Sequence, residues 1–326
     1  MTAHNQHLKK PTLKASALMA AIIASTSAAW HSTTAAQALM LQEITVTAQK
    51  RVESLQDVPL SVSVLSGEKL NDTGIANLQD LSAFVPNFTI NQTGISTTIS
   101  IRGISSGINQ GFEQSVGTYV DGIHYGRAQL ARAPLFDLER VEVLRGPQSI
   151  LFRKNSVAGA VNITTAKPSD EFESSITALY SPDHGEKDFR FVASGALSET
   201  LGARLAILQR TFDGYYENTI SGQDEADSEE QVLRGTLDWQ ATDNLRATLK
   251  LEHASFDVNG RNIEVINDTA GETGFGFSTI YGPITGGGTL DATQDFKRQA
   301  NGDTSENETE TFVLTVEYLI AANTLT

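Results

Sequence analysis

The sequence predicts a small α+β domain followed by antiparallel strands of a transmembrane β-barrel, and the barrel is incomplete in this chain. Three observations predict this fold class. The stretch from Glu43 to Pro168 alternates short apolar segments with glycine-rich turns, long segments from Phe172 onward alternate apolar and polar residues, and short turns alternate with long polar connections. An apolar side chain at every second position is typical of a strand with one apolar face.

The first 38 residues have the composition of an export signal. Three lysines precede an apolar stretch that runs from Ala15 to about Ala29, and residues 36–38 (AQA) form a small-residue cleavage pattern. Cleavage at Ala28 or Ala29, or an ordinary N-terminal helix, would be the alternatives. We expect residues 1–38 to be removed and residues 39–50 to form a separate segment ahead of the folded domain.

Composition excludes several classes of protein. The formal net charge of −15 makes nucleic acid a poor partner, because phosphates would be repelled. The absence of cysteine excludes disulfide frameworks, thiolate metal sites and cysteine nucleophiles. After the N-terminal region, no run of 18 uncharged apolar residues occurs, which argues against a polytopic helical membrane protein.

Capping residues and turns predict the elements of the α+β domain, which we place at residues 51–168. Ser61–Leu65 is a β-branched strand that runs into a helix with Ser66 as N-cap and Gly74 as left-handed stop. Asn77 caps a second helix, which Pro86 ends. Further short strands are predicted at Phe88–Ile90, Thr97–Ile101, Ser115–Val120 and Glu139–Leu144.

The region 169–326 is predicted to hold the first six to seven strands of a barrel. In Leu233–Gln240 the odd positions are apolar or glycine and the even positions are polar, and residues 245–252 and 311–320 repeat this pattern. Weaker versions occur at 172–180, 188–197 and 203–212. These lengths match the 9–11 residues that a tilted strand needs to cross a bilayer.

The connections distinguish a barrel from a soluble sandwich, which would also alternate. The links at 198–201, 241–244 and 321–323 are tight, whereas those at 181–186, 214–229 and 257–308 are longer and rich in polar residues and glycine. A structureless loop as long as the last one argues against a compact soluble domain. Short turns at one end and long loops at the other are typical of an outer-membrane barrel.

A short β-branched segment, Glu43–Ala48 (EITVTA), precedes the α+β domain. It can pair its backbone with a strand of another protein, or it can form the first strand of the domain itself, and composition does not decide between these. With the residues that follow, it resembles the TonB box of TonB-dependent outer-membrane receptors. Further stretches resemble the plug domain of that family: SLQDVP at 54–59, IRG at 101–103, SVGTYVDGIHY at 115–125, LFDLERVEVLRGP at 135–147 and GAVNIT at 159–164.

This resemblance implies active uptake of a scarce large ligand, commonly a ferric siderophore, across the outer membrane of a Gram-negative bacterium. The implied partners are TonB, which would bind Glu43, Ile44, Thr45, Val46, Thr47 and Ala48, and outer-membrane lipid. A passive porin-like channel and a soluble ligand-binding β protein are the alternatives. Six strands and the start of a seventh at Leu325 cannot close a barrel, so we expect an N-terminal fragment that does not transport by itself.

Charged residues of the plug are candidates for coupling it to the barrel. If the lumen of the barrel presents residues such as Arg234, Lys250 and Glu252, plug charges would meet a polar wall that allows movement, although ordinary surface charge is the plainer interpretation. The candidates are Arg102, Glu139, Arg140, Glu142 and Arg145. Polar contacts separate more easily than an apolar core, which suits a movable stopper.

Ligand contact is predicted at the plug apices, and ordinary packing is the alternative for each residue. The candidates are Phe112, Tyr119, Tyr125 and Arg127. Ser149 and Arg153 stand where the family usually has glycine, which places the local plug geometry in question. The six histidines show no metal-ligand spacing, so the sequence predicts no metal, no cofactor and no catalytic site.

Overall fold

The structure is a computed structural model that describes residues 45–46, 53–54, 56, 58–92, 97–106, 114–126, 133–148, 152, 155–260, 294–298 and 304–320. All of these residues belong to one compact unit, Ile44–Thr326. The expected export signal, Leu325, Ser149 and Arg153 lie outside the described residues.

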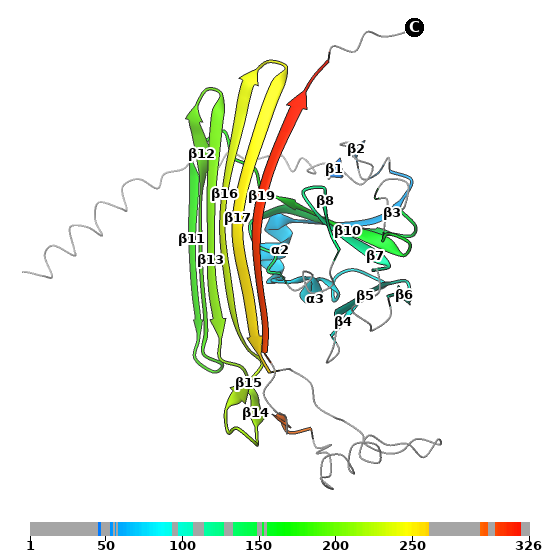
Figure 1. The fold of residues 1–326 in the computed structure, drawn as a ribbon, viewed down its shortest axis with the longest axis vertical. Coiled ribbons are helices and arrows are strands. Elements are labelled where there is room, and N and C mark those ends of the chain that lie inside the picture. The colour runs from blue at the N-terminus through cyan, green and yellow to red at the C-terminus, as the bar shows by residue number, and fades with distance from the viewer. Residues whose placement is uncertain are drawn as a thin grey trace, which may run out of the picture. The chain divides into compact units, whose positions relative to one another are not determined.

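Two short helices and nineteen strands make up the described fold, which Figure 1 shows as a ribbon. The elements of the plug are β3 (Ser61–Ser66), α2 (Gly67–Thr73), α3 (Leu78–Leu81), β4 (Phe88–Gln92), β5 (Thr97–Ile101), β6 (Ile104–Ser105), β7 (Val116–Val120), β8 (Ile123–Tyr125), β9 (Leu138–Arg145) and β10 (Gly159–Thr165). Ahead of them lie β1 (Thr45–Val46) and β2 (Glu53–Ser54). After them come β11 (Glu173–Ser181), β12 (Glu186–Ser198), β13 (Leu201–Phe212), β14 (Tyr216–Asn218), β15 (Asp224–Glu225), β16 (Asp227–Thr242), β17 (Leu245–Asn259), β18 (Lys297–Arg298) and β19 (Thr304–Tyr318).

The plug is built on a five-stranded mixed sheet of order β3-β9-β10-β7-β8, with a separate three-stranded sheet β4-β5-β6. Both helices begin at the predicted caps and α2 ends at the predicted glycine, but α3 ends at Leu81 and the chain continues as turns to Pro86, where the sequence predicted the end of the helix. Ser66 accepts a hydrogen bond from the Lys69 amide, and Gly74 ends α2 with φ 69°. Asn77 and Asp80 form a reciprocal capping box on α3. Leu78, Leu81 and strand residues such as Val141 fill one apolar core between helices and sheet.

The six long strands after the plug form one antiparallel sheet of order β11-β12-β13-β16-β17-β19, which we call the wall (Figure 1), and the short strands form a separate sheet of order β15-β14-β18. Sequential strands are neighbours throughout, so the wall is a six-stranded meander, as the alternating segments predicted. Its strands are 9 to 16 residues long, which is enough for a tilted strand to cross a bilayer.

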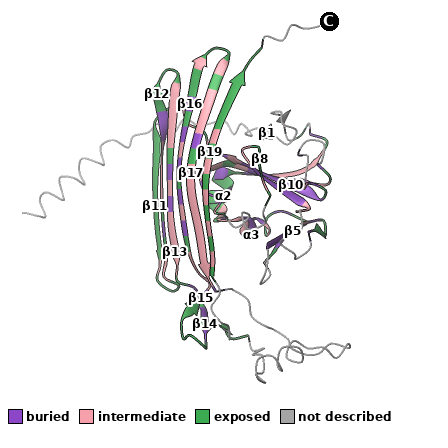
Figure 2. Cartoon of the chain, in the orientation of Figure 1, coloured by how far each residue is buried: buried purple, intermediate pink, exposed green. Residues whose placement is uncertain are grey.

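The burial of the wall is the reverse of that in a soluble sheet. On β16, Leu237 and Trp239 are 41% and 51% exposed, whereas Arg234 and Thr236 on the opposite face are each 5% exposed (Figure 2). Lys250 of the neighbouring strand is also 5% exposed. A sheet that exposes its apolar face and buries its polar face is suited to lipid on one side and a polar lumen on the other. We call these the outward and inward faces.

The connections of the wall follow the predicted asymmetry, but strands extend into two of the expected loops. The link expected at 257–308 contains the end of β17, β18 and the start of β19. β12–β13 and β16–β17 are joined by the tight turns 199–200 and 243–244, and the other links lie at the opposite ends of the strands. Residues 214–229, expected to be a loop, instead contain β14, β15 and the start of β16. The reason is local pairing, because buried Asn218 donates to Glu225 and β14 also pairs with β18. Within the described ranges, no helix combines the length and apolar composition needed to span a membrane.

Candidate functional site

The contact between the plug and the wall is the candidate functional site, and a single aromatic side chain lies at its centre. Phe136, which precedes β9, is 6% exposed and packs against an apolar patch on the inward face of the wall. Ala206, Leu208 and Val232 form the buried part of this patch, and Val192 and Ala254 pack at its margin. These small and branched side chains interrupt the otherwise polar inward face, and the ring of Phe136 packs against them.

Two arginines of the wall hold the residue next to this ring. Asp137 is 4% exposed as a side chain, and Arg204 of β13 donates to it through Nε and Nη2, with the shortest distance 2.6 Å. Arg234 of β16 donates from Nη1 to the carbonyl oxygens of Phe136 at 2.9 Å and Asp137 at 3.1 Å. A forked guanidinium–carboxylate pair is directional and stronger than a contact between neutral groups.

Arg204 also joins the plug to the chain that leads into the wall. Its Nη1 donates to Glu173 of β11 at 2.9 Å and to the carbonyl oxygen of Lys167 at 3.4 Å. The backbone of Asp137 has φ 54°, a conformation that is uncommon for a residue with a Cβ. The chain therefore bends at Asp137. As a result, the ring of Phe136 and the carboxylate of Asp137 face the same region of the wall.

A second contact lies at the β7–β8 turn. The ammonium group of Lys250 on β17 pairs with Asp121, whose carboxylate also accepts from the amide of Thr165 at 2.9 Å and from its hydroxyl at 2.8 Å. Burial alone would raise the pKa of Asp121, but the charge of Lys250 and the hydrogen bonds from Lys250 and Thr165 hold the pKa below its usual range. Asp121 is therefore a stable anion that bridges the plug and the wall.

Known proteins resemble this chain in both the plug and the wall. Residues 54–160 match the model of the TonB-dependent Receptor Plug Domain. The pesticin receptor of Yersinia pestis is 30% identical over 169 residues, which cover 51% of this chain and 25% of that protein. The ferrioxamine B receptor of Salmonella typhimurium is 27% identical over 203 residues, covering 59% and 27%.

Solved structures agree on the fold. The ferric yersiniabactin uptake receptor of Yersinia pestis superposes with a TM-score of 0.66 at 22% identity, covering 80% of this chain and 39% of that one. The ferripyoverdine receptor of Pseudomonas aeruginosa superposes with a TM-score of 0.63 at 16% identity, covering 84% and 34%.

Residues 54–160 form a plug domain of the TonB-dependent receptor family. The chain is an outer-membrane protein of a Gram-negative bacterium, and its wall resembles in fold the barrel strands of such receptors. The chain spans about a quarter of the length of the curated relatives it matches.

The five charged residues predicted to couple the plug of this TonB-dependent receptor to the barrel make their described contacts within the plug. Glu142 is fully buried, and its carboxylate accepts hydrogen bonds from Nε of Arg140 at 2.8 Å and from Nδ2 of Asn162 at 3.1 Å. Arg140 also pairs with Glu139. Arg140 and Glu142 lie two residues apart on the same face of β9, and Asn162 lies opposite Glu142 on β10, so these contacts are internal to the plug.

Arg102 and Arg145 likewise contact the plug. Arg102 occupies the β5–β6 turn with φ 52°, and its amide donates to the Asn87 carbonyl oxygen at 2.9 Å. Arg145 donates from Nη1 to the Pro86 carbonyl oxygen at 3.2 Å. Among the described residues, Asp121, Phe136 and Asp137 contact the wall, and the coupling role of the five predicted residues stays a prediction.

Two residues of the segment predicted to be the TonB box pair within the chain. Thr45 and Val46 form β1, which pairs antiparallel with β2 through the register Thr45↔Ser54 and Val46↔Glu53. The other predicted TonB-binding residues, Glu43, Ile44, Thr47 and Ala48, lie outside the described residues. The pairing of β1 with β2 involves only two residues of each strand, so a strand of another protein can displace β2 at little cost.

Two of the four predicted ligand residues, Tyr119 and Tyr125, lie among the described residues. Tyr119 is 6% exposed, donates its hydroxyl to the Phe152 carbonyl oxygen and packs on the rings of His124 and Phe152. Burial raises the pKa of this hydroxyl. Tyr119 is therefore a core residue, which is the packing alternative that the sequence left open. Tyr125 is half-buried on β8, and Phe112 and Arg127 lie outside the described residues.

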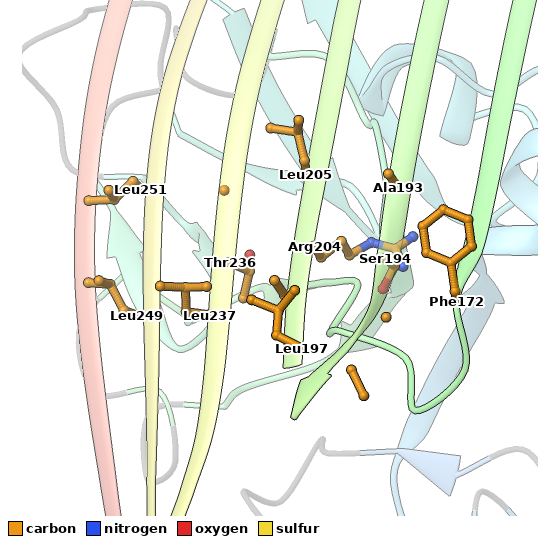
Figure 3. A pocket seen from close by; sticks show the side chains of 14 residues that line it. Phe172, Ala193, Ser194, Leu197, Arg204, Leu205, Thr236, Leu237, Leu249 and Leu251 are labelled. Atoms are coloured by element: carbon orange, nitrogen blue, oxygen red, sulfur yellow. The ribbon is translucent and has the colours of Figure 1, made fainter. Parts of the chain in front are cut away.

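A hollow of about 430 Å³ lies on the wall, and Figure 3 shows the side chains around it. Leu205, Leu237 and Leu251 line it from three neighbouring strands, and Phe172 lines its far side. These side chains belong to the outward face, where they are 39–80% exposed. The hollow is therefore part of the lipid-facing surface of the receptor rather than a site for a polar ligand.

The contact between Asp121 and Lys250 should weaken in acid. Since the pKa of Asp121 is lower in the folded receptor than its ordinary value of 3.8, its contribution to stability is complete above that value and is lost as the pH falls through the folded pKa. We expect the stability of the plug to fall more steeply below pH 4 in the parent chain than in Asp121→Asn. Denaturant unfolding of both chains between pH 6 and pH 3 measures this, and equal slopes would contradict it.

Proposed function

We propose that this chain is the N-terminal part of a receptor that takes up a ferric siderophore across the outer membrane with energy supplied through TonB. The observation that carries the proposal is the nature of the plug contact. One ring and a few ionic pairs, formed by Asp121, Asp137 and their partners Arg204, Arg234 and Lys250, hold the plug to the inward face. Such a contact holds the plug in place and can still be broken and re-formed, because polar groups can exchange their partners for water.

The relatives support the ligand class. The names of two matched receptors refer to pesticin and ferrioxamine B, and the titles of two similar structures refer to ferric yersiniabactin and ferripyoverdine. Three of these four ligands are iron chelates by name, so we infer a ferric siderophore for this receptor too. The relatives are receptors and transporters, and the proposed function requires no bond-making chemistry from the protein.

In the proposed cycle, the ligand binds at the outer side of the receptor and TonB pairs with the box on the periplasmic side. β1 then exchanges its pairing with β2 for pairing with a strand of TonB, which is recognition through main-chain hydrogen bonds. Force applied to the box reaches the plug, and the ionic pairs of Asp121 and Asp137 separate. Water at the polar inward face can hydrate the separated groups, which keeps the step reversible.

In a receptor with a complete barrel, removing Glu43–Ala48 should abolish energised uptake of a ferric siderophore and binding of the TonB periplasmic domain, while ligand binding remains. A sharper comparison uses Val46→Pro and Val46→Ala. Proline removes the backbone N–H that a paired strand requires, whereas alanine keeps it. We expect Val46→Pro to lower TonB binding at least tenfold and Val46→Ala to lower it less than threefold. Titration of the purified chain with the TonB periplasmic domain measures both, and undiminished binding by Val46→Pro would refute the role of the box.

A further inference from the structure

The outward face of the wall changes character at one row of residues. Leu251 on β17 and Phe312 on β19 are directly opposite each other and are 49% and 70% exposed. In the next row toward the long connections, His253 is opposite Glu310, and Glu308 stands one further outward position along β19. The apolar surface therefore ends where a histidine and two glutamates begin.

These three side chains converge. One possible ligand atom from each of His253, Glu308 and Glu310 lies within 4.8 Å of those of the other two, and Nδ1 of His253 is 3.9 Å from Oε1 of Glu308. The antiparallel register explains this, because directly opposite residues have Cβ atoms about 4.5–5.5 Å apart and diagonal neighbours remain within reach of long side chains. Rigid strands therefore bring the three groups together without any loop.

The surroundings favour a cation. The outward positions nearest to the three residues on the same strands include Asp257 and Glu306, which face each other, and no lysine or arginine occupies an outward position of β17 or β19 in the described residues. Like charges directly opposite each other destabilise a strand pair. A positive charge bound among them would offset that repulsion.

We propose that His253, Glu308 and Glu310 form a divalent transition-metal site that joins β17 to β19 at the outer margin of the lipid-facing surface. Imidazole and carboxylate ligands together suit zinc and neighbouring metals of the first transition row. Three protein ligands leave the remaining coordination positions for water. The imidazole distinguishes this cluster from a patch of carboxylates, which would favour calcium or magnesium.

A protonated His253 that pairs with Glu308 is the competing explanation for the same geometry. The two explanations differ in what the ring must supply, because an ion pair needs only positive charge, whereas a metal site needs a nitrogen lone pair. His253→Lys separates them, since lysine keeps a positive charge beside the glutamates and removes the imidazole. His253→Ala removes both.

Zinc titration of the full chain in detergent micelles, followed by calorimetry, tests the proposal. We expect one zinc ion to bind to the parent, and the affinity to fall at least tenfold in His253→Ala, in His253→Lys and in the double variant Glu308→Gln/Glu310→Gln. His184→Ala is the matched control, because His184 is also exposed and lies outside the cluster, and it should retain this binding. Parent-like zinc binding by His253→Lys, loss of binding in His184→Ala, or absence of zinc binding in the parent would overturn the proposal.

A second measurement identifies the ligand directly. The electron paramagnetic resonance spectrum of Cu²⁺ bound to the parent should show coupling to an imidazole nitrogen, and His253→Ala should lose it. Circular dichroism of each variant verifies that the strands remain folded, and we expect no change because the three side chains are partly or fully exposed. A copper spectrum that is identical in parent and His253→Ala would contradict the assignment.

Discussion

Replacing Arg204 with alanine should weaken the attachment of the plug to the wall by about 3–5 kcal/mol, which is the cost of leaving one member of a buried ion pair without its partner. Asp137 is 4% exposed and receives two hydrogen bonds from the Arg204 side chain at 3.0 Å or less. Without them its carboxylate stays buried, and Arg234 contacts it only at 3.9 Å. The contacts of Arg204 with Glu173 and Lys167 are lost as well.

Native-state hydrogen exchange of β9 and β10 amides in the full chain measures this loss. Arg190→Ala is the matched control, because Arg190 is a wall arginine that pairs with Asp188 of its own strand. We expect the control to change plug stability by less than about 1 kcal/mol, the usual range for a partly exposed ion pair. Equal exchange rates in Arg204→Ala and Arg190→Ala would show that the Asp137 pair does not hold the plug.

Replacing Phe136 with alanine should lower the stability of the docked plug by about 3–5 kcal/mol, as expected when a buried phenylalanine is truncated. The ring is the one plug side chain in the apolar cluster that it shares with Ala206, Leu208 and Val232. Truncation therefore removes apolar burial and leaves a cavity between the plug and the wall. Polar contacts alone must then hold the plug to the wall. Phe136→Leu should recover part of the loss.

Denaturant unfolding of the plug, monitored separately from the wall, tests this prediction. Phe84→Ala provides the control, since Phe84 is a plug phenylalanine that is 48% exposed, and we expect a change within about 0.5 kcal/mol. A double-mutant cycle with Val232→Ala should give a coupling energy of about 0.5–3 kcal/mol if the two side chains touch in the folded receptor. A coupling energy of zero would show that the Phe136 ring does not contact Val232.

The sequence predicted local features well because their causes are local. Ser66, Gly74 and Asn77 act on amides within a few residues, so the helix boundaries follow from short sequence patterns. The alternation in β16 also depends only on strand geometry, which places successive side chains on opposite faces. The two faces of the wall were therefore predictable without knowledge of the pairing of strands.

The coupling residues were predicted less well, because charge alone does not specify a partner. Glu142 and Arg140 are candidates by charge, and in the structure they pair with each other, while Glu142 also accepts from Asn162 of β10. Asp137 lies in the same motif and was passed over, although it is the residue that reaches Arg204. The weaker alternation at 203–212 was a usable signal, since Ala206 and Leu208 are the inward apolar residues that receive Phe136.

By itself, the sequence determined the class of this protein: a capped α+β plug, a wall of strands with one apolar face, and a β-branched box ahead of both. These depend on spacing along the chain, which a single sequence contains. Only the tertiary structure decided which groups meet, such as Asp121 with Lys250 or His253 with Glu308 and Glu310. Electrostatic attraction and metal coordination depend on distances of a few ångströms in space, and strand register sets those distances between residues far apart in the chain.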